Sequence, residues 1–317
     1  MIKVGIAGAD NPMAGELLRL CLRHPDVDIV SAYAGSLAGM SVGAIHHGFI
    51  GEENIVFSSN FDATNLDVAF IFNPLYSDSD WAKLMADRQK LRLIIFPGAE
   101  SVATALPRTP VYGLSEMNRK PMVRGAREAL VPDSIASPVL TALYPFASHL
   151  LLRGDLDINV EVPADMISDS ALNKSEREIE RELASVQASF LGKVRIHAKE
   201  SAGPRAMKIS MRLPSTVALE EILKAYDSVY DDHNFTFVVT HPVGPEEVES
   251  TNKIIISLSK PSSSEIDINI VADPRMRGGA GEAIHIMNLL LGLHEKTGLD
   301  LKTSAWMIPK VKGNGLK

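Results

Sequence analysis

The segment 131–138, Val-Pro-Asp-Ser-Ile-Ala-Ser-Pro, places the hydroxyl group of Ser134 directly before a predicted helix that begins near Ala136. A serine hydroxyl attacks a carbonyl carbon only when an adjacent base removes its proton. The sequence shows no such base beside Ser134. The alternative is a structural role, because serine is among the residues preferred at helix N-caps. The absence of a base favours the cap over the nucleophile.

The chain has one cysteine, Cys21, on the apolar face of a helix predicted over Met13–His24. A free cysteine behaves as a small hydrophobic residue, so we expect packing rather than chemistry. One cysteine excludes an intrachain disulfide and is consistent with a reducing, cytoplasmic environment. His46 and His47 are adjacent, with no third ligand near them in the sequence. Adjacent side chains point apart on regular structure, so we predict no metal site here.

Gly5 and Gly8 lie in the first predicted strand and in the turn that follows it. Glycines at such a turn let the backbone approach a dinucleotide pyrophosphate, whose charge then lies at a helix N-terminus. Asn11 and Pro12 come next, and this pair is typical of an N-cap followed by the first helical residue. The Asn11 side chain would occupy N–H donors that a phosphate needs, and Asp10 would repel the phosphate. These residues disfavour pyrophosphate binding.

The segment after the second predicted strand lacks both residue types that read the adenosine ribose. An acid there favours NAD and an arginine favours NADP, whereas this chain has Gly35 and Ser36. The 59 residues from His24 to Ala82 contain eight acids and no lysine or arginine. A 2′-phosphate would meet a field of the wrong sign in this region.

Another glycine-rich turn, Gly278-Gly279-Ala280-Gly281, opens a helix predicted over Ala280–Leu293. A helix N-terminus of this kind attracts anions. The alternative is a packing role, in which residues without side chains let the helix approach its neighbours closely. The sequence leaves both interpretations open.

Strands and helices alternate in the first half of the chain. Continuous apolar runs predict buried strands at Ile2–Ala7, Asp28–Tyr33, Asp67–Phe72 and Leu91–Phe96, with helices at Met13–His24 and Asp80–Gln89. This alternation is typical of a doubly wound, Rossmann-like α/β domain with a parallel sheet.

From about residue 150 the pattern changes to strands joined by short turns. The predicted strands are Asp157–Val162, Lys193–Ala198, Met207–Leu213, Phe235–Thr240, Lys253–Leu258 and Ile266–Ala272. The predicted helices between them are Ser175–Phe190 and Val217–Tyr226. This pattern favours a mixed or antiparallel sheet of the α+β type.

The composition is that of a soluble globular protein, with 45% hydrophobic and 22% charged residues. A length of 317 residues is enough for two domains with separate cores. No apolar run of about 18 residues occurs, so we expect neither a membrane span nor a signal peptide. The net charge of −7 argues against a nucleic acid or an anionic membrane as partner.

Several motifs resemble those of N-acetyl-γ-glutamyl-phosphate reductases, within the aspartate-semialdehyde dehydrogenase superfamily. Tyr112–Arg119 and 131–138 resemble the segment that carries their nucleophilic cysteine, in a context like Asn-Pro-Gly-Cys-Tyr-Pro-Thr. Gly278–Leu299 resembles Gly-Ala-Ala-Gly-Gln…Met-Asn-Leu-Met-Phe-Gly-Leu…Thr-Gly-Leu. Gly15–Pro25 is similar to Ala-Glu-Leu-Leu-Arg-Leu…Arg-His-Pro, and Glu178–Leu183 to Pro-Glu-Ile-Glu-Gln-Glu-Leu. The matches follow the same order along the whole chain.

The resemblance implies a nucleotide-binding domain over 1–150 plus 278–317 and a substrate and dimerisation domain over 151–277. It also implies an NAD(P) cofactor, a small-molecule metabolite as substrate, and a homodimer or homotetramer formed through the second domain. In this view Gly279, Gly281 and Asn288 contribute to the cofactor site.

The resemblance also assigns catalytic positions. Ser134 matches the cysteine, and Asn173 and Ser175 match the two histidines of a His-Arg-His-Thr-Pro-Glu segment that supplies the general base. His197 matches a histidine of the substrate-binding loop. Arg205 lies two residues beyond the Arg-Gly position of that loop, and its guanidinium is a candidate clamp for an anionic group. The alternative for Arg205 is a surface arginine beside a turn.

Together these replacements bear on the reaction. A thiol is partly ionised at neutral pH, whereas an alcohol is not. We therefore expect the thioester-forming reduction of an acyl phosphate to be lost or altered. Lys174 or Glu176 replaces the missing imidazoles only after a large pKa shift. Two functions remain: an NAD(P)-linked oxidoreductase that acts without a thioester, and a non-catalytic homologue that binds a metabolite or a partner subunit.

Overall fold

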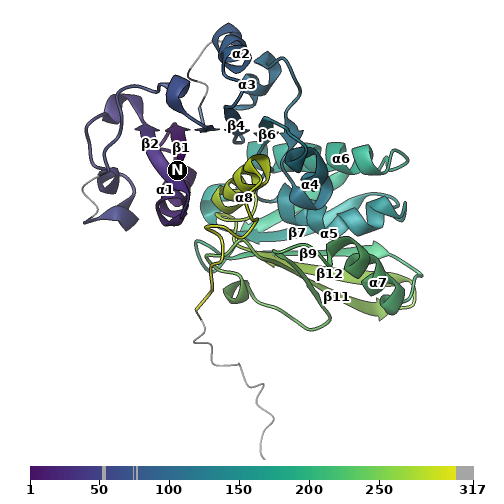
Figure 1. The fold of residues 1–317 in the computed structure, drawn as a ribbon. Coiled ribbons are helices and arrows are strands. Elements are labelled where there is room, and N and C mark those ends of the chain that lie inside the picture. Colours follow the sequence, from purple (N-terminus) through teal and green to yellow (C-terminus); the bar gives the residue numbers. More distant parts are fainter. Residues whose placement is uncertain (52–54, 74, 76–77, 305–317) are drawn as a thin grey trace, which may run out of the picture.

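The structure is a computed structural model that describes residues 1–51, 55–73, 75 and 78–304. It contains two six-stranded sheets (Figure 1). The first sheet is parallel throughout, in the order β2-β1-β3-β4-β6-β5. Its strands are β1 (Ile2–Ala7), β2 (Val27–Tyr33), β3 (Val68–Ile71), β4 (Arg92–Ile95), β5 (Val111–Tyr112) and β6 (Glu128–Leu130). The predicted doubly wound parallel sheet is confirmed.

Helices cover both faces of this sheet, which explains why its central strands are apolar without alternation. They are α1 (Pro12–Arg23), α2 (Asp78–Asp87), α3 (Glu100–Ala105), α4 (Ser115–Val123) and α8 (Ala280–Leu291). Val68 and Phe70 of β3 pack in the core that includes α1 and α8, whereas Ala69 and Ile71 pack with residues of α2 and α3. Cys21 is buried and unbonded on α1, as predicted, and burial raises the pKa of its thiol to about 12.

The second sheet is mixed, in the order β10-β11-β12-β9-β7-β8. Its strands are β7 (Leu156–Val162), β8 (Val194–Glu200), β9 (Met207–Pro214), β10 (Thr236–Val239), β11 (Ile254–Ser262) and β12 (Glu265–Ala272). β7 with β8 and β10 with β11 are parallel pairs, and the other three pairs are antiparallel. The predicted mixed α+β sheet is confirmed.

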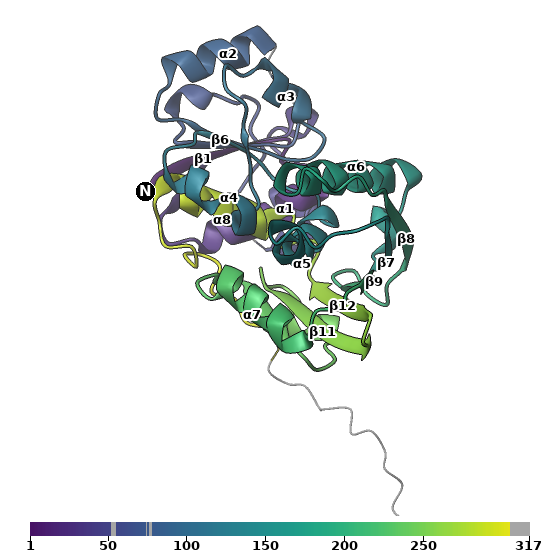
Figure 2. The same cartoon turned by 90° about the vertical axis from the view of Figure 1, so that its right-hand side faces the viewer.

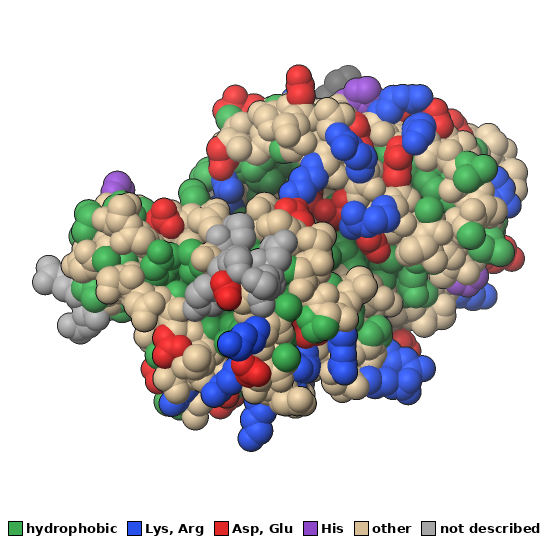
Figure 3. All heavy atoms as spheres, turned by 90° about the horizontal axis from the view of Figure 1, so that it is seen from above, with side chains coloured by type: hydrophobic (Ala, Val, Ile, Leu, Met, Phe, Trp, Pro, Cys, Tyr) green, Lys and Arg blue, Asp and Glu red, His purple; other side chains and the backbone are tan. Residues whose placement is uncertain are grey.

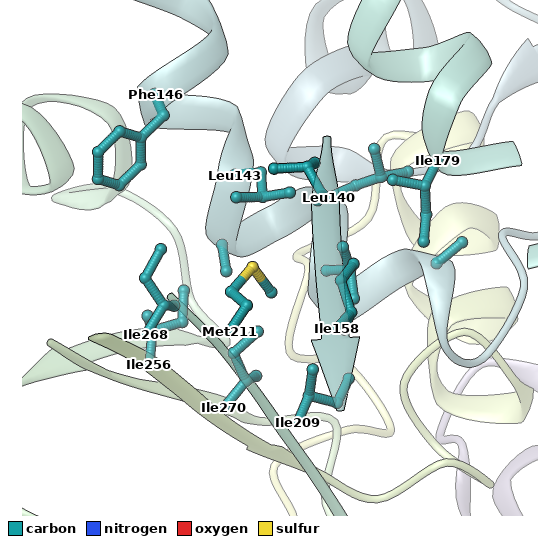
Figure 4. Close-up of a cluster of buried hydrophobic side chains, with 14 of the residues drawn as sticks. Leu140, Leu143, Phe146, Ile158, Ile179, Ile209, Met211, Ile256, Ile268 and Ile270 are labelled. Atoms are coloured by element: carbon teal, nitrogen blue, oxygen red, sulfur yellow. The ribbon is translucent and has the colours of Figure 1, made fainter. Parts of the chain in front are cut away.

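One face of the second sheet packs against helices α5 (Ala136–Ser148), α6 (Asp169–Val186) and α7 (Leu219–Tyr230) (Figure 2). Leu140 and Leu143 of α5 point toward Ile158 and Met211 of the sheet (Figure 4). The strands alternate buried and exposed residues because only this face is covered.

Two features of the fold differ from the prediction. α6 begins at Asp169 rather than at Ser175, because the Ser168 hydroxyl accepts the N–H of Ala171 at 3.2 Å and caps the helix. The short elements α3, α4, β5 and β6 were not predicted. β6 has three residues and β5 has two, so neither displays a periodic pattern, and pairing with neighbouring strands defines them.

The two hydrophobic cores favour another domain division. The boundary at residue 150 assigns α5 to the first domain, but its apolar residues belong to the core under the second sheet. Apart from Leu114, the buried residues of that core begin at Ile135, whereas Val131 belongs to the first core. We therefore propose the boundary at about residue 133. α8 packs against α1 in the first core.

Candidate functional site

A cleft of about 810 Å³ lies where the carboxyl ends of β4, β5 and β6 face α6. Open parallel sheets bind ligands at this end of their strands. The strand side contributes Phe96, Tyr112 and Val131, and α6 contributes charged residues that include Arg177 and Glu178. Viewed from above, this end of the molecule carries acidic and basic side chains intermixed (Figure 3). A separate apolar hollow of about 370 Å³, between α5 and α7, contains none of the predicted site residues.

Ser134 is 8% exposed, and its hydroxyl donates to the carbonyl oxygen of Gly278 at 3.1 Å. It does not cap α5, so the predicted cap is wrong. Asp133 takes that role, because its Oδ1 accepts the N–H groups of Ile135 and Ala136 at 2.9 and 3.1 Å. A carboxylate at this position satisfies N–H groups at the start of the helix more strongly than a hydroxyl.

The positions matched to histidines separate in the structure. Asn173 is exposed on α6 and its carbonyl oxygen accepts from Arg177. Ser175 is 1% exposed, and its hydroxyl donates to Asp133 Oδ1 at 2.6 Å. Ser175 is therefore a buried, hydrogen-bonded residue of α6, whereas Asn173 is exposed. Through this hydrogen bond Ser175 contacts Asp133, the residue that precedes Ser134 in the sequence.

Glu178 is the titratable group that the sequence did not single out as a site residue. Its Oε1 accepts the Tyr112 hydroxyl at 2.8 Å and the Asp133 N–H at 2.9 Å. Burial raises the pKa of Glu178 to about 7, and the nearby Asp133 carboxylate adds to the rise. A carboxyl group with this pKa exchanges protons near neutral pH. The spacing of Ser175 and Glu178, three residues apart on one helix, was the available signal.

Arg277, next to the carbonyl that holds Ser134, is fully buried. It forms ion pairs with Glu116 of α4 and with Glu282 of α8, the latter at 3.3 Å. Burial alone would raise the pKa of Glu116, but the Arg277 guanidinium holds it at about 2. Glu282 also accepts the Ser137 hydroxyl of α5 at 2.9 Å. These contacts fix the loop before α8 against both cores.

His197 and Arg205 lie away from the cleft. His197 is exposed on β8 and contacts Asp157 on the open face of the second sheet, with 3.3 Å between Nε2 and Oδ1. Arg205 binds two carboxylates: its Nε donates to Asp273 at 2.6 Å and its Nη2 to Glu16 at 3.0 Å. The guanidinium that was the candidate anion clamp is thus engaged within the chain.

In the turn between β1 and α1, the backbone N–H groups donate hydrogen bonds to acceptors within the protein. Gly8 and Ala9 both donate to the Tyr33 carbonyl oxygen, at 3.0 and 2.7 Å. Asn11 donates its N–H to Gly8 O at 3.1 Å, and its Oδ1 accepts the Met13 N–H at 2.9 Å. The predicted cap by Asn11 is therefore present.

The remaining N–H groups at the start of α1 also have acceptors, with one exception. Pro12 has no N–H, and those of Ala14 and Gly15 donate to Asn11 O at 2.8 and 3.3 Å. From Gly8 to Gly15, in the part of the chain that the structure describes, only the Asp10 N–H lacks an acceptor. The ring of His46 closes over the same turn, with its Nε2 2.7 Å from Ala9 O.

Comparison with known proteins gives the family. No family model matches the chain. The chain is 30% identical, over 96% of its length, to the whole of an N-acetyl-gamma-glutamyl-phosphate reductase of Parabacteroides distasonis. It is 29% identical, over the same share, to the reductases of Phocaeicola vulgatus and Bacteroides fragilis. The chain belongs to the N-acetyl-gamma-glutamyl-phosphate reductase family.

Solved structures agree on the fold. An aspartate semialdehyde dehydrogenase II of Vibrio cholerae, complexed with ASA, has a TM-score of 0.63 at 13% identity and covers 92% of this chain and 98% of its own. An aspartate semialdehyde dehydrogenase of Candida albicans, solved with NADP, has a TM-score of 0.61 at 15% identity and covers the same shares. The semialdehyde dehydrogenase fold therefore spans both sheets.

The turn of this reductase-family chain does not fit a dinucleotide pyrophosphate. A phosphate at the α1 N-terminus needs free N–H donors, and here nearly all of them already have acceptors. Asp10 is exposed at the same turn and brings a negative charge. Gly35 and Ser36 are exposed after β2 and offer no cation for a 2′-phosphate. Figure 3 shows the adjoining lobe, at its left, without lysine or arginine.

The remaining predicted cofactor residues have packing contacts in the structure. Gly278 has a φ of +63°, and a Cβ there would lie 2.5 Å from Ser134 Cα. A Cβ at Gly279 would lie 2.9 Å from the Met13 side chain, and one at Gly281 would lie 2.7 Å from that of Asn252. These contacts favour the packing interpretation of the turn.

Asn288 and Gly5 are enclosed in the first core. Asn288 is fully buried: its Oδ1 lies 3.1 Å from His24 Nε2, and its Nδ2 donates to the carbonyl oxygens of Glu295 and Thr297. Its side chain is not available to a ligand. Gly5 lies inside β1, where a Cβ would meet the side chain of Leu66.

Within the described ranges, no group of three or more histidine, cysteine or acidic side chains is arranged to hold a metal ion. In the same ranges, no helix has the length and apolar character to cross a bilayer.

Proposed function

We propose that this chain is a divergent member of its family that has lost the thioester-forming reduction of an acyl phosphate. We propose further that it binds a small organic molecule in the cleft beside Glu178. The observation that carries the proposal is the hydrogen bond from the Ser134 hydroxyl to Gly278 O, at 3.1 Å. A hydroxyl held on a carbonyl oxygen, with no base beside it, is not activated for attack.

The surroundings of Ser134 support the same conclusion. A base must lie within hydrogen-bond reach of the nucleophile. Asn173 does not ionise, and the Ser175 hydroxyl is bound to Asp133. Lys174 forms an ion pair with Glu100, and Glu176 accepts the N–H of Ile196 at 2.8 Å. None of these groups contacts Ser134.

One observation favours a second candidate, an NAD(P)-linked oxidoreductase that acts on a free carbonyl group. Glu178 and Tyr112 form a hydrogen-bonded pair in the cleft, and the Glu178 pKa of about 7 suits proton donation to a carbonyl oxygen. Because the β1–α1 turn does not fit a pyrophosphate, we assign no hydride-transfer step to this chain.

An assay with and without a thiol at position 134 tests the main proposal. We expect wild-type protein to show no NADPH oxidation with N-acetyl-gamma-glutamyl phosphate, and Ser134→Cys to gain none, because no base contacts position 134. Reaction of the Cys variant with iodoacetamide checks that the new thiol is accessible. Wild-type turnover that disappears in Ser134→Ala would contradict the proposal.

Titration of the wild-type protein with NADH and NADPH, followed by nicotinamide fluorescence, separates the two candidates. We expect no saturable binding of either nucleotide below 1 mM. Saturable binding below that concentration would favour the oxidoreductase and would mean that the β1–α1 turn accepts a pyrophosphate.

We also propose a homodimer or homotetramer that assembles through the second domain. The support is the open face of the second sheet, where the helices α5 to α7 do not pack. Light scattering coupled to size exclusion tests this, and a monomeric mass at micromolar concentration would contradict it.

A further inference from the structure

We infer that Arg177 is the side chain that recognises an anionic group in the cleft beside Glu178. It takes the role for which Arg205 was the candidate in the sequence. The inference rests on the proposed small-molecule function of the cleft. It names the ligand class as a small organic acid that carries a carboxylate or a phosphate.

The first support is position. Lys174, Arg177 and Arg181 follow one another at spacings of three and four on α6, so they share one face of the helix. All three line the cleft of about 810 Å³. The helix therefore presents a row of cations to the carboxyl ends of the parallel strands.

The second support is the pairing of these cations. Lys174 forms an ion pair with Glu100 of α3, and Arg181 Nε donates to Glu182 at 2.8 Å. Arg177 donates its Nε to the Asn173 carbonyl oxygen at 3.2 Å. Among the residues that the structure describes, no carboxylate lies within ion-pair distance of Arg177. Its two terminal nitrogens are thus left for a bidentate contact with a carboxylate or phosphate.

The third support is that Arg205, the other candidate for binding an anion, is already held in ion pairs. Arg205 is held by Glu16 and by Asp273, whose side chain is fully buried. Releasing Arg205 for a ligand would leave a buried carboxylate without its cation, which is strongly unfavourable. Arg177 carries no such cost, because it is exposed and neutralises no buried group.

The lining of the cleft narrows the ligand further. The wall opposite α6 offers the hydroxyl-bearing Thr104 and Thr109 and the apolar Phe96 and Pro110. A short carbon chain packs on such a wall while its acid group reaches Arg177. Cleft ligands of this size are typically held by apolar contacts plus a few polar groups.

Isothermal titration with glutarate and with inorganic phosphate tests the inference. We expect saturable binding of at least one probe to the wild type, at least tenfold weaker binding in Arg177→Gln, and partial recovery in Arg177→Lys. Binding of glutarate identifies a carboxylate site, and binding of phosphate alone identifies a phosphate site. Arg195→Gln is the matched control, because Arg195 is an exposed arginine of β8 outside the cleft.

Three results would overturn the inference: wild-type protein that binds neither probe, Arg177→Gln that binds as the wild type does, or neutral glutaramide that binds as tightly as glutarate. Thermal unfolding of each variant verifies that it is folded. The loss of the thioester reaction is tested separately at Ser134, so failure of one idea leaves the other to its own experiment.

Discussion

At the scale of single residues, Ser175, Asp133, Tyr112 and Glu178 form one hydrogen-bonded network beside the cleft. Ser175 donates to Asp133, and the Asp133 N–H and the Tyr112 hydroxyl both donate to Glu178. Within this network the pKa of Glu178 is raised to about 7. Its protonation therefore governs the charge at the inner end of the cleft.

Glu178→Gln tests this pKa through stability. A carboxyl group whose pKa rises from 4.5 to about 7 on folding binds more protons in the native state between those pH values. Stability of the wild type therefore falls as pH increases from about 5 to 8, by up to about 3 kcal/mol relative to the variant. The difference between their free energies of unfolding in urea, measured at pH 5, 6, 7 and 8, reports this loss.

The groups that face Glu178 set the size of this effect. They are Tyr112, Asp133 and Arg181, and Glu182 acts on Tyr112 in turn. Glu220→Gln on α7 is the control, because Glu220 is exposed and its removal should leave the pH dependence unchanged. Parallel pH profiles for wild type and Glu178→Gln would mean that the Glu178 pKa is not raised.

At the scale of elements, the start of α1 shows how a helix cap made by the local sequence uses hydrogen-bond donors that a ligand would need. Pro12 is the first residue of α1, and the Asn11 side chain accepts the free N–H of Met13 at the start of the helix. The N–H donors that a pyrophosphate requires are then not free. At this turn the cap that stabilises α1 and a bound phosphate would compete for the same N–H groups.

Asn11→Ala should reduce the free energy of unfolding by about 1 kcal/mol, and Asn11→Gly by only a few tenths, as for other N-cap residues. Urea denaturation at pH 7 measures both. Asn173→Ala is the matched control, since Asn173 is exposed within α6 and its side chain makes no cap. Equal losses from the alanine variants at 11 and 173 would show that the Asn11 cap contributes little.

At the scale of the whole molecule, Arg205 joins the two cores. It precedes β9 of the second sheet, yet it binds Glu16 of α1 and Asp273, which follows β12. The contact with Asp273 matters most, because the Asp273 side chain is fully buried. An uncompensated buried carboxylate is among the more destabilising defects that one substitution creates.

Arg205→Ala should therefore cost about 3 kcal/mol of unfolding free energy. Arg212→Ala, which breaks the exposed pair with Asp267, should cost less than about 1 kcal/mol. Thermal and urea unfolding at neutral pH provide the comparison. If Arg205 were instead an anion clamp, its removal would weaken glutarate or phosphate binding and leave stability close to that of the wild type.

Sequence patterns predicted the strands that are buried on both faces, such as β1, and the alternating strands of the second sheet, such as β7. These patterns reflect burial, which periodicity records directly. Patterns did not predict β5, and they misplaced the start of α6 by six residues, from Asp169 to Ser175. A two-residue strand and a helix start with several possible caps depend on neighbours that lie elsewhere in the chain.

The same limit applies to the site. The sequence by itself determined that Ser134 precedes a helix and that Asn11 and Pro12 begin α1, because residue identity and local capping are properties of adjacent residues. Tertiary structure alone decided the partners: Ser134 with Gly278, 144 residues away, and Arg205 with Glu16, 189 residues away.

The environment of Glu178 was decided in the same way. It meets Asp133 across 45 residues of chain, and the burial that raises its pKa arises from α6 packing beside the ends of the parallel strands. Proton affinity and ion pairing depend on distance and on exclusion of water, and both exist only once the two cores are assembled.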